Sequence, residues 1–363
     1  MADVCHIERV RSQLIASGID AMLIKSGTMK KYLRTLTGSG CKVLVTLERA
    51  FLILDGRYVI EAREREHDLE FIEHAQGADY LMVVQKLLND LGASVLGVEA
   101  DQMSVGEYLY ARDLGIDLVL LDDEIPLIRI IKDGEEIAAV ERACRITDEI
   151  YEDVLAELHL GMTECEISAL LHYHALRRGA QRMSFDVIVG SGPRSALPHG
   201  RPTMRAVREH EAVLMDFGIQ YDGYQSDMTR VVFIGEPDPE MRRIYDVVLE
   251  AHLVGIASMR PGAVAEDVDA AARAVIEDAG YGGCFTHGLG HGIGIGDGNE
   301  WPLLRPGSRT VLEEGMIMSC EPGVYVEGLG GVRIEDDVLV EHGGARPLNA
   351  SPKALRIIDV KKG

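Results

Sequence analysis

Hydrophobic and polar positions follow two periods in the first third of the chain. IERVRSQLIASG places apolar residues at the spacing of one helix face. The runs AMLIK, KVLVT, AFLIL, VLGVE and LVLLDD are short and apolar, as expected of strands, with helical stretches between several of them. This alternation predicts an α/β domain over residues 1–127.

The rest of the chain, residues 128–363, has a different pattern. Long helical periodicity is expected near 135–158, 164–178, 238–258 and 265–279, and glycine-rich hairpins and strands lie between and after these helices. Helices and antiparallel hairpins in separate runs predict an α+β layer architecture. The boundary is placed in DDEIPLIRIIKDGEE, where the pattern changes to a long helix.

Charge and composition narrow the class of protein. Lys and Arg total 37 against 59 Asp and Glu, so the net charge is -22 and would repel nucleic acids and anionic lipid surfaces. Apolar runs stay short of the roughly 18 residues that a membrane span needs. The six cysteines have no CxxC spacing, which favours reduced thiols. We expect a cytoplasmic protein with no nucleic acid or membrane partner.

Two predicted hairpins bring acidic residues together. In LMDFGIQYDGYQSDMTRVVF, Asp216 and Asp227 are symmetric about the point between Tyr221 and Asp222, so a turn there would place them opposite each other. In MIMSCEPGVYVEGLGGVRIEDD, Glu321 and Glu335 are symmetric about Gly328. Two carboxylates facing each other at about 5 Å repel by roughly 3 kcal/mol at an effective dielectric near 20.

Divalent cations would offset this repulsion. Four carboxylates match the charge of two divalent ions, and oxygen ligands with an imidazole suit manganese, cobalt, zinc or iron(II). Three histidines stand out as partners: His199 in SALPHGRP, and His287 and His291 in THGLGHGIG. The glycines beside the last two are interpreted as leaving room for metal and substrate. A two-metal site can deprotonate a bridging water and polarise a carbonyl or phosphoryl oxygen.

The ordered set DFG(x)8SDMTR, THGLGHGIG, SCEPGVY and GGVRIEDD resembles the pita-bread metallopeptidases, in the branch of Xaa-Pro aminopeptidases and Xaa-Pro dipeptidases (prolidases). ILDGRY and IVGSGPRSALPHGRP resemble further stretches of that branch, so the similarity spans nearly the whole chain. It implies a C-terminal pita-bread catalytic domain preceded by a smaller creatinase-like N-terminal domain.

The resemblance also implies a role for each motif residue. The cofactors would be two divalent ions, with Mn2+ favoured. Asp216 would chelate one ion, and His291 and Glu321 would complete the shell of the other. Asp227 and Glu335 would bridge both.

In the family a hydroxide that bridges the metals attacks the scissile carbonyl, and the residue matching Glu321 shuttles the proton. His199 and His287 would orient the substrate and stabilise the tetrahedral intermediate. Arg333 would pair with a substrate carboxylate or a neighbouring acid.

One segment departs from the family pattern. Where relatives have a histidine in VHExP, this chain reads IGDGNEWP, with Asn299 at that place and one residue inserted. Asparagine donates a hydrogen bond but cannot become a cation. Trp301 follows and either lines the pocket or packs in the core. The change affects recognition on the leaving-proline side, so we expect Asn299 and Trp301 to contact substrate.

The resulting hypothesis is a dinuclear hydrolase that cleaves the Xaa-Pro bond at the N-terminus of short peptides or dipeptides. A homodimer is expected, because the N-terminal domain of the relatives commonly mediates dimerisation and restricts access to the site. The alternatives are a non-peptidase amide hydrolase or lyase of the same fold, or a non-catalytic peptide-binding protein. The complete set of five ligands argues against the last alternative and against a metal-free creatinase-like enzyme.

Overall fold

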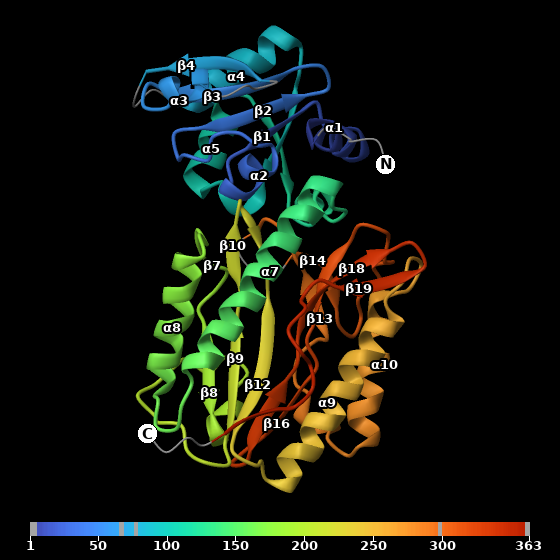
Figure 1. Cartoon of the computed structure of the whole chain (residues 1–363). Coiled ribbons are helices and arrows are strands. Elements are labelled where there is room, and N and C mark those ends of the chain that lie inside the picture. The colour runs from blue at the N-terminus through green and yellow to red at the C-terminus, as the bar shows by residue number, and fades with distance from the viewer. Residues whose placement is uncertain (1–5, 65–68, 76–78, 297–299, 360–363) are drawn as a thin grey trace. The chain divides into compact units, whose positions relative to one another are not determined.

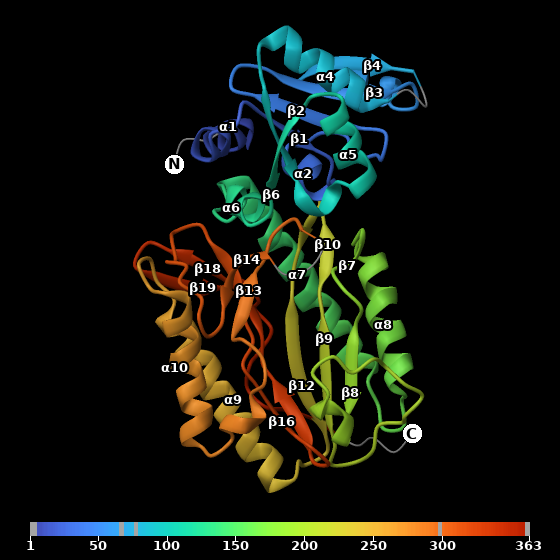
Figure 2. The ribbon, with the colours of Figure 1, turned by 180° about the vertical axis from the view of Figure 1, so that it is seen from behind.

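The structure is a computed structural model that describes residues 6–64, 69–75, 79–296 and 300–359. The chain divides into two compact units, Met1–Arg129 and Ile130–Gly363. Figures 1 and 2 show the elements of each unit from opposite sides. Each unit has its own hydrophobic core and is described by itself.

The first unit is built on a six-stranded sheet in the order β4-β3-β2-β1-β5-β6. The central pairs β1–β2 and β2–β3 are antiparallel, and the outer pairs are parallel. The strands are β1 Ala21–Ile24, β2 Lys42–Thr46, β3 Ala50–Asp55, β4 Glu70–His74, β5 Val95–Glu99 and β6 Asp117–Leu121. The helices are α1 His6–Ser17, α2 Gly27–Tyr32, α3 Val59–Glu64, α4 Tyr80–Leu91, α5 Val105–Asp113 and α6 Glu124–Ile128, with a 3-10 turn at Ala100–Gln102. Strand β4 was absent from the sequence prediction, because this edge strand buries none of its five residues and so lacks an apolar run.

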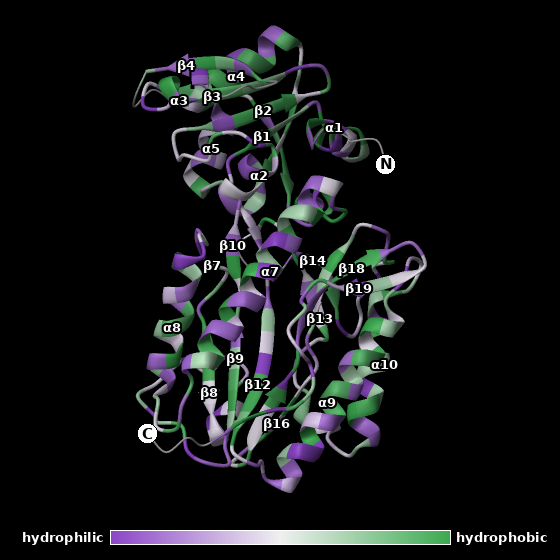
Figure 3. Ribbon diagram, in the orientation of Figure 1, coloured by the Kyte–Doolittle hydropathy of each residue, from purple (hydrophilic) through white to green (hydrophobic). Residues whose placement is uncertain are grey.

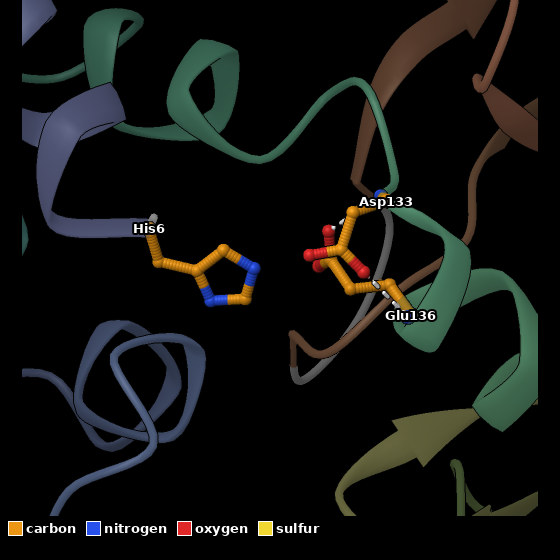
Figure 4. A group of neighbouring side chains, drawn as sticks. All are labelled: His6, Asp133 and Glu136. Atoms are coloured by element: carbon orange, nitrogen blue, oxygen red, sulfur yellow. Dashed lines mark hydrogen bonds between the residues drawn. The ribbon is translucent and has the colours of Figure 1, made fainter. Parts of the chain in front are cut away.

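The four long helices of the second unit match the four predicted ranges to within one or two residues. They are α7 Gly134–Glu157, α8 Glu164–Arg177, α9 Pro239–Ser258 and α10 Ala265–Asp278. Helix α7 begins with a capping box in which Asp133 and Glu136 each accept a hydrogen bond from the other's backbone N–H, at 2.9 and 3.0 Å (Figure 4). Hydrophilic and hydrophobic residues alternate along these helices (Figure 3), as amphipathic packing requires.

The strands of the second unit form two larger sheets and two small ones. The larger sheets have the orders β20-β12-β9-β8 and β14-β13-β15-β18-β19, and the smaller ones are β11-β10-β7 and β16-β17. The strands are β7 Arg182–Met183, β8 Ile188–Ser191, β9 Ala212–Phe217, β10 Ile219–Tyr221, β11 Tyr224–Gln225, β12 Met228–Ile234, β13 Gly290–Gly292, β14 Glu300–Leu304, β15 Ile317–Cys320, β16 Gly323–Val326, β17 Gly330–Arg333, β18 Asp336–Glu341, β19 Gly344–Pro347 and β20 Arg356–Ile358. Two 3-10 turns, Gly192–Ala196 and Gly282–Cys284, complete the unit.

Strand β9 separates the two hydrophobic clusters of this unit. Val213, Met215 and Phe217 belong to the cluster that includes α7 and α8, whereas Ala212 and Leu214 belong to the cluster that includes α9 and α10. Side chains of a strand alternate between faces, so the next residue on the second face is Asp216. The strand therefore carries a carboxylate at the end of an apolar row.

The two units together confirm the expected fold class, a larger α+β part preceded by a smaller α/β part. In the described parts of the chain, we find no helix with both the length and the apolar character needed to cross a membrane.

Candidate metal centre

The first acidic hairpin has a different register from the predicted one. Asp216 pairs with Thr229, not with Asp227, because the turn is centred between Asp222 and Gly223, one residue further along the chain. The predicted opposition of Asp216 and Asp227 is therefore wrong. The residue opposite Asp216 is thus two positions further along the chain than predicted. Side chains two positions apart on a strand point to the same face, so Asp227 lies on the same face as Thr229 and Asp216.

The second acidic hairpin has the predicted register. Cys320 pairs with Asp336 in the β15–β18 ladder, and Gly323 pairs with Arg333 in the β16–β17 ladder. The two ladders have the same register. Glu321 and Glu335 lie in the short gap between the ladders, and this register places them opposite each other. The symmetry about Gly328 is thereby confirmed, and this glycine has φ +79°, a value that suits the turn.

Three of these acids are buried within one group. Asp216, Asp227 and Glu335 are 6%, 9% and 2% exposed, and Glu321 is half-buried. Burial raises the pKa of Asp227 and Glu335 well above the ordinary range, and neighbouring acids raise them further. Burial also raises the pKa of Asp216, against the opposing effect of Arg333. The protein thus buries several carboxyl groups whose charges its own cations offset only in part.

His291 supplies a nitrogen atom to this group. Its Nε2 lies 3.7 Å from Asp227 Oδ2 and 3.5 Å from Glu321 Oε1. Asp227, His291 and Glu335 each offer one potential ligand atom, and these three atoms lie within 4.8 Å of one another. The backbone N–H of His291 donates to Ser319 Oγ at 3.0 Å, which ties β13 to β15 beside the acids. The ring therefore turns its Nε2 toward the carboxylates.

The glycines around the two histidines do not leave room for a ligand as the sequence suggested. A Cβ on Gly290 would lie 2.0 Å from the carbonyl oxygen of Ser319, and one on Gly292 would lie 2.0 Å from that of Trp301. The neighbouring strands β14 and β15 fill this space. The glycines are needed because the backbone of β13 packs closely between two other strands.

Arg333 is the central cation beside the acids and is 3% exposed. It forms an ion pair with Asp216, and its Nε donates to Thr229 Oγ1 at 2.9 Å and lies 4.0 Å from Glu335 Oε2. Its Nη1 donates to Tyr325 Oη at 2.8 Å. Of the two partners expected from the sequence, the structure shows the neighbouring acid.

A cavity of about 690 Å³ opens over the acids. It is lined by His199, His287, Trp301 and Arg333 together with Asp216, Asp227, His291, Glu321 and Glu335. His199 is exposed, and Trp301 is half-buried and also packs against the core. The structure thus brings every predicted site residue to one place except Asn299, which lies outside the described residues.

Three hydroxyl-bearing residues beside the acids were missed by the sequence reasoning, as was Leu303 of the pocket lining. Tyr325 Oη joins His287 Nε2, at 2.9 Å, to Arg333. Thr229 Oγ1 donates to Glu335 Oε2 at 2.5 Å, and Ser319 Oγ donates to Glu321 Oε1 at 3.1 Å. Their spacing in the sequence could have identified them, because each lies two or four residues from a predicted ligand on the same strand or hairpin arm. Side chains at these spacings point to the same face of an extended chain.

The donor set fits divalent cations. Within the part of the chain that the structure describes, the buried atoms Asp216 Oδ1 and Asp227 Oδ1 have no hydrogen-bond partner, although buried polar atoms are nearly always satisfied. Clustered carboxylate oxygens with one imidazole nitrogen are a ligand set for manganese, cobalt, zinc or iron(II). A set of this kind beneath an open pocket is typical of metal-dependent hydrolases.

The chain belongs to metallopeptidase family M24, whose sequence model matches residues 138–342. The Creatinase/Prolidase N-terminal domain matches residues 6–131. The structure is similar to an Xaa-Pro dipeptidase from Bacillus anthracis, with a TM-score of 0.93 and 37% identity over 97% of this chain and 99% of that chain. It is also similar to an X-Pro aminopeptidase from Thermotoga maritima, with a TM-score of 0.88 and 34% identity over 96% and 100% of the two chains. An Xaa-Pro dipeptidase of Pyrococcus furiosus is 41% identical over 235 residues, 65% of this chain and 67% of the relative.

Proposed function

We propose that this metallopeptidase is a dinuclear enzyme that cleaves the Xaa-Pro bond at the N-terminus of short peptides or dipeptides. The observation that carries the proposal is the set of four carboxylates and one imidazole at the floor of a pocket, with two buried carboxylate oxygens unpartnered in the described structure. Relatives named Xaa-Pro dipeptidase and X-Pro aminopeptidase support the choice of substrate.

The proposed ligand set divides five residues between two divalent ions, with Mn2+ favoured. Asp216 would hold one ion, Asp227 and Glu335 would bridge both, and His291 and Glu321 would complete the second. Bound divalent ions supply an activated water at neutral pH and polarise the scissile carbonyl. They would also replace the missing partners of the buried carboxylates.

The chain's own residues would move protons and orient the substrate. Glu321 is half-buried and lines the pocket, which supports the proposal that its carboxylate would take a proton from water and return it to the leaving amine. Burial lowers the pKa of His287, which favours the neutral ring. In a neutral His287 the single N–H is on Nδ1 and donates to the Gly288 carbonyl at 2.8 Å, so Nε2 accepts from Tyr325 Oη at 2.9 Å. The proposed donation to the carbonyl oxygen, as negative charge develops there, would therefore require the ring to exchange one of these partners for the substrate.

His199 and Trp301 would act on the substrate from the pocket wall. His199 is exposed at the pocket and can donate a hydrogen bond to a peptide carbonyl. Trp301 and Leu303 occupy alternate positions of β14 and both line the pocket. Together they present an apolar wall that suits the proline ring.

The proposal includes a cytoplasmic homodimer. The match of residues 6–131 to the Creatinase/Prolidase N-terminal domain supports the homodimer, because this domain commonly mediates dimerisation in the branch that the chain resembles. The five cysteines in the described residues are free, which suits a reducing compartment.

The test is an assay of the manganese-reconstituted protein on Ala-Pro, Ala-Pro-Ala and Ala-Ala-Ala. We expect metal-dependent turnover of one or both proline peptides and much slower turnover of Ala-Ala-Ala. Comparable turnover of all three would contradict the Xaa-Pro specificity. Turnover of none would remove the peptidase proposal and leave a different amide substrate for the same site.

A further inference from the structure

Glu164 is a buried acid that the proposed reaction does not use. It lies in the first turn of α8 and is 0% exposed. Its Oε1 accepts hydrogen bonds from the backbone N–H and the hydroxyl of Ser191, both at 2.8 Å. Its Oε2 accepts from the backbone N–H and the hydroxyl of Thr203, at 3.0 and 2.6 Å. Arg194 Nε reaches both oxygens, at 3.0 and 3.2 Å.

The two residues that Glu164 binds are the two ends of one loop. The loop runs over residues 192–203 and carries His199 to the pocket. Its middle is fixed at two further points: Ser195 Oγ accepts from the N–H of Gly331 at 2.8 Å, and Arg333 Nη1 donates to the Pro198 carbonyl at 3.3 Å. The carboxylate of Glu164 therefore holds the two ends of the loop together. The middle of the loop contacts β17, the strand that carries Arg333.

The charge of Glu164 suits this task. Burial alone would raise the pKa of its carboxyl, but the hydrogen bonds from Thr203, Ser191 and Arg194 outweigh burial and lower it. A buried charged acceptor is costly without good partners, and hydrogen bonds to a charged acceptor are stronger than neutral ones. Glu164 accepts six such bonds from five donor groups, all of them in the loop or in Ser191 just before it. The capping of α8 is done by Thr163 and Glu166 instead.

We propose that Glu164 is a positioning residue that holds His199 over the pocket by fixing both ends of the 192–203 loop. The inference rests on the substrate-orienting role proposed above for His199. In Glu164→Gln an amide nitrogen replaces one oxygen, so one end of the loop faces a donor in place of an acceptor. That end of the loop then loses its anchor to the carboxylate, and His199 is held less firmly, by the contacts of Ser195 and Pro198 and by the other end of the loop.

The test compares four manganese-loaded, full-length proteins: the natural protein, Glu164→Gln, His199→Ala and the double variant. A displacement of about 1 Å in a positioned group costs up to about a hundredfold in rate, so we expect Glu164→Gln to lower kcat/KM for Ala-Pro by at least about tenfold. In the His199→Ala background the same substitution should change kcat/KM less than about twofold, because the residue it positions is absent.

The matched control is Glu166→Gln. Glu166 lies two residues along the same helix turn and caps α8 through Thr163, at 2.7 and 2.8 Å, without contacting the loop. We expect it to leave kcat/KM within about twofold, because glutamine keeps the acceptor oxygen that a capping box needs and Glu166 does not contact the loop. As a readout that does not depend on activity, trypsin should cleave after Arg194, which precedes Ser195 in the loop, faster in Glu164→Gln than in the natural protein or in Glu166→Gln.

The experiments test the positioning role of Glu164 and the proposed peptidase function separately. Equal losses of kcat/KM from Glu164→Gln in both backgrounds, or a loss of stability alone, would overturn the positioning role. If the natural protein fails to turn over Ala-Pro, the proposed function fails, and the trypsin comparison still decides whether Glu164 holds the loop. Should Glu164→Gln not fold, Thr203→Val removes a single bond to Glu164 and replaces it in the same comparisons.

Discussion

Glu321 and Glu335 lie opposite each other in one hairpin, because the register that pairs Cys320 with Asp336 also pairs Gly323 with Arg333. The β15–β18 ladder lies on one side of the two acids and the β16–β17 ladder on the other, so the backbone that carries both carboxylates is held rigidly. Sites built on strands are positioned more precisely than sites built on loops. The repulsion between the two acids is therefore maintained by the fold until cations offset it.

Tyr325 links His287 to Arg333, so removing its hydroxyl should affect both. In Tyr325→Phe, His287 loses its partner at Nε2 and Arg333 loses one acceptor. We expect kcat for Ala-Pro to fall by about tenfold to a hundredfold, as for other lost oriented donors, with little change in KM. Steady-state kinetics of the manganese-loaded variant measure this.

The control for that variant is Tyr245→Phe. Tyr245 Oη donates to the Lys353 carbonyl at 3.0 Å, away from the pocket lining. Its loss should lower the free energy of unfolding by about 1 kcal/mol and leave kcat unchanged. Equal kinetic effects of the two substitutions would show that the hydroxyl of Tyr325 has no special part in the site.

Thr229 is the hydroxyl that joins Glu335 to Arg333. Thr229→Val keeps the shape of the side chain and removes hydrogen bonds of 2.5 and 2.9 Å. Glu335 would then be less well oriented, and we expect manganese affinity to weaken by about 10- to 100-fold, as for other residues that orient metal ligands. Titration calorimetry with Mn2+ measures the change, and an unaltered affinity would exclude an orienting role.

Asn299 is the departure from the family pattern. Asn299→His restores an imidazole that can carry a proton and a charge at neutral pH. We expect the variant to change kcat/KM for Ala-Pro by at least about fivefold, or about 1 kcal/mol, while manganese affinity stays the same because the five proposed ligands are untouched. Unchanged kinetics would show that the asparagine is neutral.

Glu164 should give a measurable dependence of stability on pH. Its folded-state pKa is lowered from 4.5, so its ionised form stabilises the protein above that value and this contribution is lost as the pH falls through the folded-state pKa. The cations that face it are Arg194, whose Nε donates to both of its oxygens, and Arg205. The difference in unfolding free energy between the natural protein and Glu164→Gln should be largest near pH 7 and should shrink below about pH 4. Denaturant unfolding at several pH values tests this, and a difference that grows toward acid would contradict it.

Much of the fold could be predicted from hydrophobic periodicity alone. The four helices of the second unit were predicted to within two residues because each is long and amphipathic. The register of the second hairpin was also predictable, since its turn EGLGG has one symmetric centre. Strand β4 could not be predicted, because an exposed edge strand has no apolar run.

Other features depend on three-dimensional contacts that periodicity does not record. The first hairpin turns at Asp222 and Gly223, and the pairing of Asp216 with Thr229 follows from that shift. The purpose of Gly290 and Gly292 became clear only from the close approach of β14 and β15. Glu164 is an ordinary acid at a helix start in the sequence, and only the loop that folds back onto it gives it a further role.

Metal stoichiometry tests the central claim most directly. After manganese loading and removal of free metal, mass spectrometry of the metal content should find two ions per chain. Asp227→Asn, which alters the proposed bridging carboxylate, should lose bound manganese and activity together. Glu327→Gln, an exposed acid in the turn of the same hairpin, should keep both. One ion or none in the natural protein, or full occupancy in Asp227→Asn, would contradict a dinuclear centre built on these residues.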